Sequence, residues 1–310
     1  MKRILIAAIP CLLFLAGTEG VAKDPKQTED VISNILNEAS GDTVTDKKKT
    51  PSGSEATVDR IDKIDPKTTS DRKGRPGSIP GRDKKSESTG EEAAPQISNE
   101  EQVLLKTGID FYNSGLYEHA LKKFKELGAK FPKSALLDGS HSWMGKANLK
   151  LYKYDDAIKE FFAIPADSIE YPGAIFYTGE SHLMKGDQIS ALENFEKVYS
   201  RFPQNELADK ALLNAGKLYL NQNKGAQALD SAVKLIKYYK DRDTIDDAYY
   251  LLAKVYETDA KLKDIETARK IYKLFIKKGE ADERFGKSPL RKRVEQDLAR
   301  IERLYFKMER

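Results

Sequence analysis

Two stretches of the chain, YNSGLYEHALKKF at 112–124 and LMKGDQISALENF at 183–195, follow one scheme. Each has a Gly, then a few polar or aromatic residues, then an Ala followed four residues later by Phe. A wider spacing supports this scheme, because a small residue ends the core of each expected first helix at intervals of 37, 34, 37 and 37 residues. These positions are Gly108, Gly145, Gly179, Gly216 and Ala253. A fixed period of this length predicts a chain built from copies of one helix–turn–helix unit.

The expected second helix of each unit repeats as well. Its small residues lie 37, 34, 37 and 40 apart, at Ala120, Ala157, Ala191, Ala228 and Ala268. Four residues later come Phe124, Phe161, Phe195, Ala232 and Tyr272. Residues four apart share one helix face, so the small residue permits close approach of the paired helices and the aromatic ring fills the space beside that contact. Pro132 and Pro203 each follow a Phe and are expected to end the second helix of two units.

The pattern resembles the tetratricopeptide repeat (TPR), a helix–turn–helix unit of 34 residues with small residues where its helices touch. The resemblance covers residues 100–280 and implies an all-α superhelical solenoid of about five repeats. Three sites depart from it: Ala232 lacks the aromatic, Tyr171-Pro172 replaces Phe-Pro, and the fifth unit has the longer turn AKLKDIET. Residues 281–310 are expected to form a capping helix, opening at Ser288-Pro289, that covers the last apolar face of the solenoid.

Two longer stretches narrow the resemblance. FKELGAKFPKSALLDGSHSWMGKANL and FEKVYSRFPQNELADKALLNAGKLYL are similar to exported TPR proteins of bacterial cell envelopes. Two families share the aromatic-Pro, the short polar stretch and the Ala-rich helix: the periplasmic TPR protein associated with the Tol–Pal system, and the TPR lipoprotein of the outer-membrane β-barrel assembly machine. The first usually has an N-terminal coiled coil, whereas residues 23–98 show no sustained heptads. The second is lipidated, whereas Cys11 lacks the flanking sequence of a lipid site. The resemblance therefore implies an exported TPR protein of the bacterial cell envelope and does not decide between the two families.

Residues 1–22 have the three parts of a secretory signal peptide. Lys2 and Arg3 precede an apolar run over 4–16, and the small residues 20–22 suit a cleavage site before Lys23. A run of this length is short for a bilayer span, although a retained membrane anchor stays an alternative. The sequence thus predicts export to the periplasm, with outer-membrane association as an option. Cys11, the sole cysteine, would leave with the signal, so the mature chain would have no disulfide and no thiolate.

Residues 23–99 differ from the rest of the chain. They are rich in Lys, Asp, Ser, Thr, Gly and Pro and contain no aromatic residue, so they bury too little apolar surface to offset the entropy of ordering. They are predicted to be a disordered linker, which could also bind peptidoglycan, membrane or nothing. A short amphipathic helix is expected near 28–40, with apolar residues Val31, Ile32, Ile35 and Leu36 on one face. It is either a transient helix or a docking helix that folds in a partner's groove.

Charge and residue content argue against several function classes. The 53 basic and 49 acidic residues nearly cancel, so there is no clustered excess of positive charge for nucleic acid. The only histidines, His119, His141 and His182, lie in three separate units, and no spacing brings two of them together with a carboxylate as zinc requires. There is no Gly-rich phosphate loop. We therefore expect no catalytic residue, metal, cofactor or small-molecule substrate.

What remains is a surface for another protein. In a TPR array the first helices line the concave side, so the family geometry implies a mixed groove of aromatic, aliphatic and lysine side chains. Its expected residues are Tyr112, Asn113, Lys146, Leu149, Phe176, Glu180, Leu183, Leu213, Lys217, Leu220, Tyr250 and Lys254. Such a groove suits an extended peptide or a helix with apolar anchors and some acidic charge, although the recurring lysines could equally serve solubility alone.

Two functions follow as hypotheses. The first is a non-catalytic scaffold or adaptor of the bacterial cell envelope, whose partner is another envelope protein or peptide segment. The second is an accessory regulatory subunit of an envelope enzyme such as a peptidoglycan synthase or hydrolase, and only this one predicts a changed reaction rate when the chain is added to the enzyme. Self-association through the groove or through residues 28–41 is also open, and membrane association is expected to be at most indirect.

Overall fold

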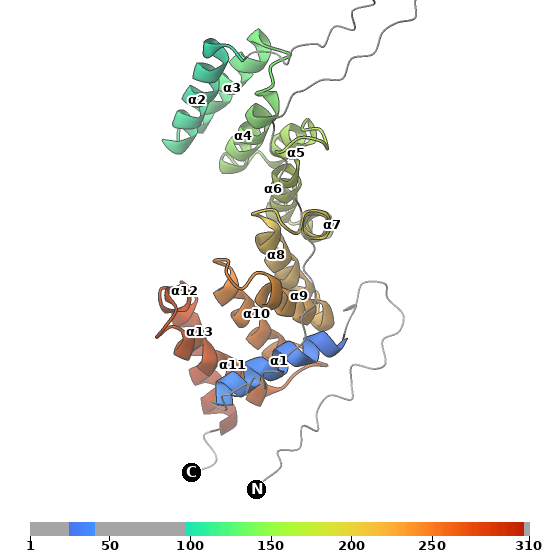
Figure 1. Cartoon of the computed structure of the whole chain (residues 1–310), viewed down its shortest axis with the longest axis vertical. Helices are drawn as coiled ribbons and strands as arrows, with labels where there is room; N and C mark the ends of the chain where they lie inside the picture. Colours follow the sequence, from blue (N-terminus) through green and yellow to red (C-terminus); the bar gives the residue numbers. More distant parts are fainter. Residues whose placement is uncertain (1–24, 41–96, 307–310) are drawn as a thin grey trace, which may run out of the picture. The chain divides into compact units, whose positions relative to one another are not determined.

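The computed structural model describes residues 25–40 and 97–306, and all of these belong to one compact unit. The predicted signal peptide, most of the predicted linker and residues 307–310 lie outside the described residues. The described chain is entirely helical, as expected. Figure 1 shows the helices following one another from α2 to α13, with α1 beside α11.

Five helix pairs form the TPR solenoid. In order they are α2 (Asn99–Asn113) with α3 (Tyr117–Lys130), α4 (Leu137–Lys150) with α5 (Tyr154–Phe162), α6 (Tyr171–Met184) with α7 (Gln188–Arg201), α8 (Ala208–Asn221) with α9 (Gly225–Tyr238), and α10 (Ile245–Thr258) with α11 (Ile265–Lys278). Each helix packs on the next along the chain, and α8 also packs on α10 and α4 on α6. The first helices α2, α4 and α6 are therefore neighbours of one another, as are α8 and α10.

The predicted contact between small residue and aromatic ring is present in the first three pairs. A Cβ added to Gly108 or Gly145 would lie 2.4 Å from Cε1 of Phe124 or Phe161, and one at Gly179 would lie 2.9 Å from Cε1 of Phe195. The three rings are buried. In the fourth unit, where Ala232 replaces the aromatic, the corresponding space at Gly216 is filled by Leu251 of the next first helix and by Ser231.

The turn inside each of the first four units needs one residue with left-handed backbone. Gly115 and Gly186 supply it with φ of 77° and 84°, whereas Tyr152 and Asn223 adopt φ of 60° and 58° at the equivalent positions. Left-handed backbone is unusual for a residue with a side chain, and is least strained for Gly. Tyr152 is therefore held in a strained turn, with its ring exposed to solvent.

The second unit has the shortest second helix. The residues after α5, Ala163-Ile164-Pro165, end the helix after nine residues, whereas the other second helices of the solenoid have fourteen. Pro cannot continue a helix because it lacks the backbone donor and its ring clashes with the preceding turn. The helix is five residues shorter than the others, and the connection 163–170 that follows it is two residues longer than the connections after α3, α7 and α9, which together give the interval of 34 residues.

The predicted terminal helix is divided. A short helix α12 (Glu283–Gly286) precedes α13 (Arg291–Ile301), and Glu302–Phe306 continues as a π-helical segment. Val294 and Ile301 of α13 are buried against the last pair, and Phe285 of α12 packs edge-on against Phe275 and Tyr249. The expected helix thus begins later than Ser288-Pro289, and α12 shares the covering of the end of the solenoid.

Helix α1 (Pro25–Ser40) is the remaining element. It packs against α11 and α9, and its Ile32 and Ile35 belong to the largest buried apolar cluster, which α8 to α13 form. The amphipathic helix expected near 28–40 is present, and it lies on the chain's own C-terminal repeats.

Candidate functional site

A pocket of about 370 Å³ opens among the first helices of the first three units. Its lining comes from α2, α4, α6, the turn after α4 and the first residue of α5, and consists of Tyr112, Lys146, Leu149, Lys150, Tyr152, Tyr154, Tyr177, Glu180 and Met184. We call these residues the α2–α4–α6 pocket. Four of them, Tyr112, Lys146, Leu149 and Glu180, are among the predicted groove residues, and the structure brings these four together.

Aromatic rings frame one wall of the α2–α4–α6 pocket. Tyr112 meets Trp143 edge-on with ring centroids 5.0 Å apart. The ammonium of Lys146 lies 4.6 Å from the Trp143 centroid and 5.0 Å from that of Tyr177, in cation–π geometry. Burial lowers the pKa of Lys146, against the opposing influence of Glu170 and Glu206. This lysine is therefore a positive charge held partly out of water.

Lys146 differs from its two repeat counterparts. Lys217 and Lys254 also directly follow the small residue of their first helix. Each of them pairs with a carboxylate on another helix. Lys217 Nζ lies 2.8 Å from Asp247 Oδ1 on α10, and Lys254 Nζ lies 3.7 Å from Asp297 Oδ2 on α13. Thirty residues after Lys217 comes Asp247, but thirty residues after Lys146 comes Phe176. Among the described residues no carboxylate lies within ion-pair distance of Lys146.

Glu180 occupies the equivalent position in the third unit, one residue after Gly179. Burial raises the pKa of its carboxyl group, although Lys150 and Lys210 act in the opposite direction. The pocket thus contains a half-buried lysine and a half-buried glutamate from neighbouring first helices, and no ion pair joins them.

Glu180 gives a pH-dependent prediction. When folding raises the pKa of a carboxyl group, the ionised group destabilises the folded state. This lowers the free energy of unfolding as pH rises from the pKa of the unfolded state, near 4.5, through the pKa of the folded state. Below that window the group is neutral in both states. We therefore expect Glu180→Gln to raise the free energy of unfolding, relative to the wild type, by more at pH 7 than at pH 4, as measured by urea unfolding. The exposed Glu193→Gln serves as control, and equal differences at both pH values for Glu180→Gln would contradict the prediction.

Two predicted groove residues lie elsewhere. Phe176 and Leu213 are 3% and 5% exposed and pack in the apolar clusters of α6–α8 and α8–α11, so they hold repeats together and do not line an open face. Leu183 and Leu220 are half-buried against the same clusters. Asn113 is exposed at the end of α2, and Lys217 is engaged by Asp247. The prediction for Phe176 and Leu213 is therefore wrong, because their position on the first helix faces the neighbouring helices.

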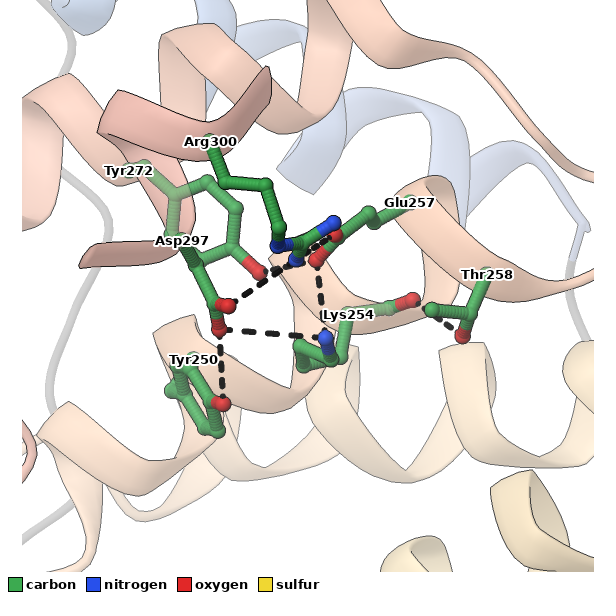
Figure 2. A network of polar contacts seen from close by, with 7 residues as sticks. All are labelled: Tyr250, Lys254, Glu257, Thr258, Tyr272, Asp297 and Arg300. Carbon is green, nitrogen blue, oxygen red and sulfur yellow. Dashed lines mark hydrogen bonds and ion pairs between the residues drawn. The ribbon is translucent and has the colours of Figure 1, made fainter. Parts of the chain in front are cut away.

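Tyr250 and Lys254, the last two predicted groove residues, take part in a polar network with α13 (Figure 2). Tyr250 donates a hydrogen bond of 3.0 Å to Asp297, and Lys254 donates one of 2.8 Å to Glu257. Glu257 also accepts from Tyr272 at 2.7 Å and from Arg300, while Arg300 donates to Asp297 at 2.9 Å. The C-terminal part of the predicted groove is thus occupied by the chain's own last helix.

Burial and hydrogen bonding act in opposite directions within the network. Burial acts to raise the pKa of Glu257, but the hydrogen bonds from Lys254, Tyr272 and Arg300 outweigh it, and the pKa lies below its usual value. Burial and the neighbouring Asp297 raise the pKa of Tyr250 to about 12. The hydrogen bond from Arg300 and the charge of Lys254 likewise outweigh burial at Asp297 and lower its pKa, so both carboxylates are charged at neutral pH.

No grouping for metal binding occurs within the described ranges, where no three His, Cys, Asp or Glu side chains converge. His141 pairs with Glu160 at 2.7 Å and His182 with Asp187 at 3.2 Å, each within its own unit. Of the helices that the structure describes, none combines the length and the apolar character needed to cross a bilayer.

The fold has known relatives. The structure is similar to that of a tetratricopeptide repeat protein from Parabacteroides merdae ATCC 43184, with a TM-score of 0.52 and 14% identity over 67% of this chain and 80% of that chain. This chain has the tetratricopeptide repeat fold. A family model described as "YfiO: Outer membrane lipoprotein" matches residues 169–299, less than half of the chain, so the TPR protein resembles envelope proteins of this kind over its C-terminal repeats.

Other solved structures are less similar. The MamA protein gives a TM-score of 0.49 with 16% identity over 60% of this chain and 97% of that chain. A thermophilic TPR protein from Thermus thermophilus gives 0.42 with 20% identity over 64% and 99%. No curated protein matches the sequence. The fold and the likeness to the YfiO model together indicate a protein–protein interaction scaffold.

Five residues of the pocket were not anticipated from the sequence: Lys150, Tyr152, Tyr154, Tyr177 and Met184. Tyr177 follows the mispredicted Phe176 directly, and one residue is a rotation of about 100° on a helix. Tyr177 lies two residues before the small residue of its helix, as Trp143 does, and this repeat would have pointed to Tyr177. Tyr152 carries a signal too, since a tyrosine stands where two other units have Gly.

Proposed function

We propose that this TPR protein is a non-catalytic interaction scaffold of the bacterial cell envelope that binds a segment of another envelope protein in the α2–α4–α6 pocket. The TPR fold supports the binding role, and the likeness of residues 169–299 to the outer membrane lipoprotein family supports the envelope location. Export to the periplasm is part of the proposal and rests on the sequence of residues 1–22.

The observation that carries the proposal is the unsatisfied charge of Lys146. Its counterparts Lys217 and Lys254 each hold a carboxylate of another helix, whereas Lys146 has the faces of Trp143 and Tyr177 beside it and is influenced by Glu170 and Glu206 only from beyond ion-pair distance. A half-buried ammonium gains most from a carboxylate, because the attraction is stronger where water is partly excluded. We assign that carboxylate to the partner.

The rest of the pocket specifies the partner further. Tyr112, Leu149 and Met184 present apolar surface for an aliphatic or aromatic anchor. Glu180 lies in the same pocket and suits a hydrogen-bond donor. The partner segment therefore carries an acidic residue, an apolar anchor and a donor within a short distance, in an extended or helical conformation.

Site-specific photo-crosslinking tests the proposal. The probes replace Tyr152 and Met184, which are exposed at the rim of the pocket, and the control probe replaces Phe162, an equally exposed aromatic on α5 outside it. We expect one envelope protein to be captured at both rim positions and not at Phe162. The crosslinked peptide should contain an Asp or Glu, and replacing that residue by its amide should abolish capture. Capture at all three positions alike, or at Phe162 alone, would contradict the proposal.

Lys146→Glu gives the matching prediction on this chain. Reversing a half-buried charge that pairs with a carboxylate costs about 2–5 kcal/mol of binding. We therefore expect capture at Tyr152 to fall by at least about tenfold. The control is Lys122→Glu, the same change at an exposed lysine of α3. Unchanged capture by Lys146→Glu would show that this lysine only keeps the surface soluble.

A further inference from the structure

The outer face of α9 and α11 carries a helix that is not a repeat. Helix α1 lies along α11 and also touches α9 (Figure 1). Ile32 and Ile35 are 7% and 3% exposed, and Val31, Leu36 and Ala39 pack beside them on the same cluster. One face of α1 is therefore seated on the C-terminal repeats, while Ser33 and Asn34 on the other face are exposed.

An ion pair contributes to the packing of α1 at its C-terminal end. Glu38 accepts a hydrogen bond of 2.5 Å from the ammonium of Lys278 on α11. The same ammonium lies 5.3 Å from the ring centroid of Tyr249, on α10. An acidic residue of α1 thus meets a cation that also lies over a ring of the last repeat, and this contact joins the C-terminal end of α1 to α11.

Helix α1 is joined to the solenoid through a long connection. Residues 41–96 separate it from the solenoid, and the helix packs on the fourth and fifth units and not on the first, which follows it in sequence. A helix of sixteen residues is marginal in water by itself, so its order depends on the surface beneath it. These are the properties of a ligand attached by a tether.

We propose that the outer face of α9 and α11 is a second binding site of this protein, specific for an amphipathic helix, and that α1 is its ligand, bound reversibly in cis. With residues 41–96 as the linker that the sequence predicts, the effective concentration of α1 at the site is raised, so the site is mostly filled without a tight contact. Docking places the N-terminal end of the described chain against its last repeats. Release frees this end to the full reach of residues 41–96, up to roughly 190 Å at about 3.4 Å per residue.

The first test uses full-length chains and a labelled peptide of residues 25–40. Ile32→Asp together with Ile35→Asp vacates the site, and Ser33→Asp with Asn34→Asp puts the same charges on the exposed face of α1. We expect the peptide to bind the vacated chain at least about tenfold more tightly than the wild type or the control, in fluorescence anisotropy, because it no longer competes with a tethered helix. No binding to the vacated chain, or equal binding to all three, would overturn the proposal. So would a loss of the helicity of the repeats in the vacated chain, since α1 would then be part of the fold.

The second test leaves the apolar contact intact. Lys278→Glu should speed hydrogen exchange of the backbone amides of residues 31–36 by about three- to fivefold, since a half-exposed ion pair becomes a repulsion. Combining it with Glu38→Lys should restore the slow exchange. If Lys278→Glu changes nothing, or if the exchanged pair fails to restore protection, α1 does not occupy the seat described here.

Discussion

Replacing Glu257 by Leu is expected to lower the free energy of unfolding of the C-terminal repeats by about 3–5 kcal/mol, the cost of removing one partner from a buried ionic network. Glu257 is 6% exposed and accepts hydrogen bonds from Lys254, Tyr272 and Arg300. The hydroxyl of Tyr272 is buried and would lose its acceptor, and Arg300 would lose its link to α10. The helix α13 should therefore detach from the end of the solenoid, as measured by urea unfolding and by hydrogen exchange of residues 291–301.

The matched control and the pH dependence sharpen this prediction. Glu266→Leu changes an exposed glutamate of α11, with surface ion pairs only, and should cost less than about 1 kcal/mol. The hydrogen bonds hold the pKa of Glu257 below its usual value of 4.5, so its contribution is present above pH 4.5 and is lost as pH falls towards the folded pKa. The difference between wild type and Glu257→Leu should accordingly shrink below pH 4.5. A difference that does not change with pH would mean that Glu257 acts through packing alone.

The repeats were predictable because their signal is local and recurs. The small residue of each first helix and the Phe of the second meet as the spacing of Gly145 and Phe161 indicates, and the same holds at Gly108 and Gly179. Each copy of the repeat therefore supports the interpretation of the other copies. In the one unit that has Ala232 in place of the aromatic, Leu251 from the next unit fills the space beside the small residue. No pattern within a single unit predicts this contact.

The pocket was only partly predictable because a period does not fix the rotation of a helix about its axis. Phe176 and Tyr177 are adjacent, yet one is buried between helices and the other faces the pocket. Which of them turns inward depends on how α6 packs on α4 and α7. Tyr152 reaches the pocket through a left-handed turn, and that conformation is also a tertiary outcome.

The seat of α1 could not be predicted at all from residues 25–40. Their apolar face was clear, but the surface that receives it is formed by α9 and α11, about two hundred residues later in the sequence. The closure of α13 over Tyr250 and Lys254 is a similar case. Both contacts join segments outside the repeat pattern to the last repeats, where periodicity gives no information.

Gly145→Ala is expected to reverse the sign of its effect when Phe161 is truncated. In the wild type, the added Cβ would lie 2.4 Å from the Phe161 ring, so the ring or the helix must shift, at a cost of about 1–3 kcal/mol. Phe161→Ala alone should cost about 3–5 kcal/mol, because a ring that is 2% exposed leaves a cavity. In the Phe161→Ala background the three nearest atoms to the Cβ of residue 145 are removed, so the clash is relieved, and Ala is then favoured over Gly in a helix by about 1 kcal/mol.

The double-mutant cycle measures this coupling directly. The four free energies of unfolding should give an interaction energy of about 2–4 kcal/mol, at the upper end of the range observed for residues in contact. The control is Gly139→Ala in the same two backgrounds, since a Cβ on this glycine of α4 meets nothing within 4 Å. Additive effects at Gly145 and Phe161 would show that the helices of the second unit separate freely, and the explanation of the repeat by close approach would fail. A reversal of sign at Gly145 alone would establish that the small residue is required because the aromatic ring of its own unit lies against it.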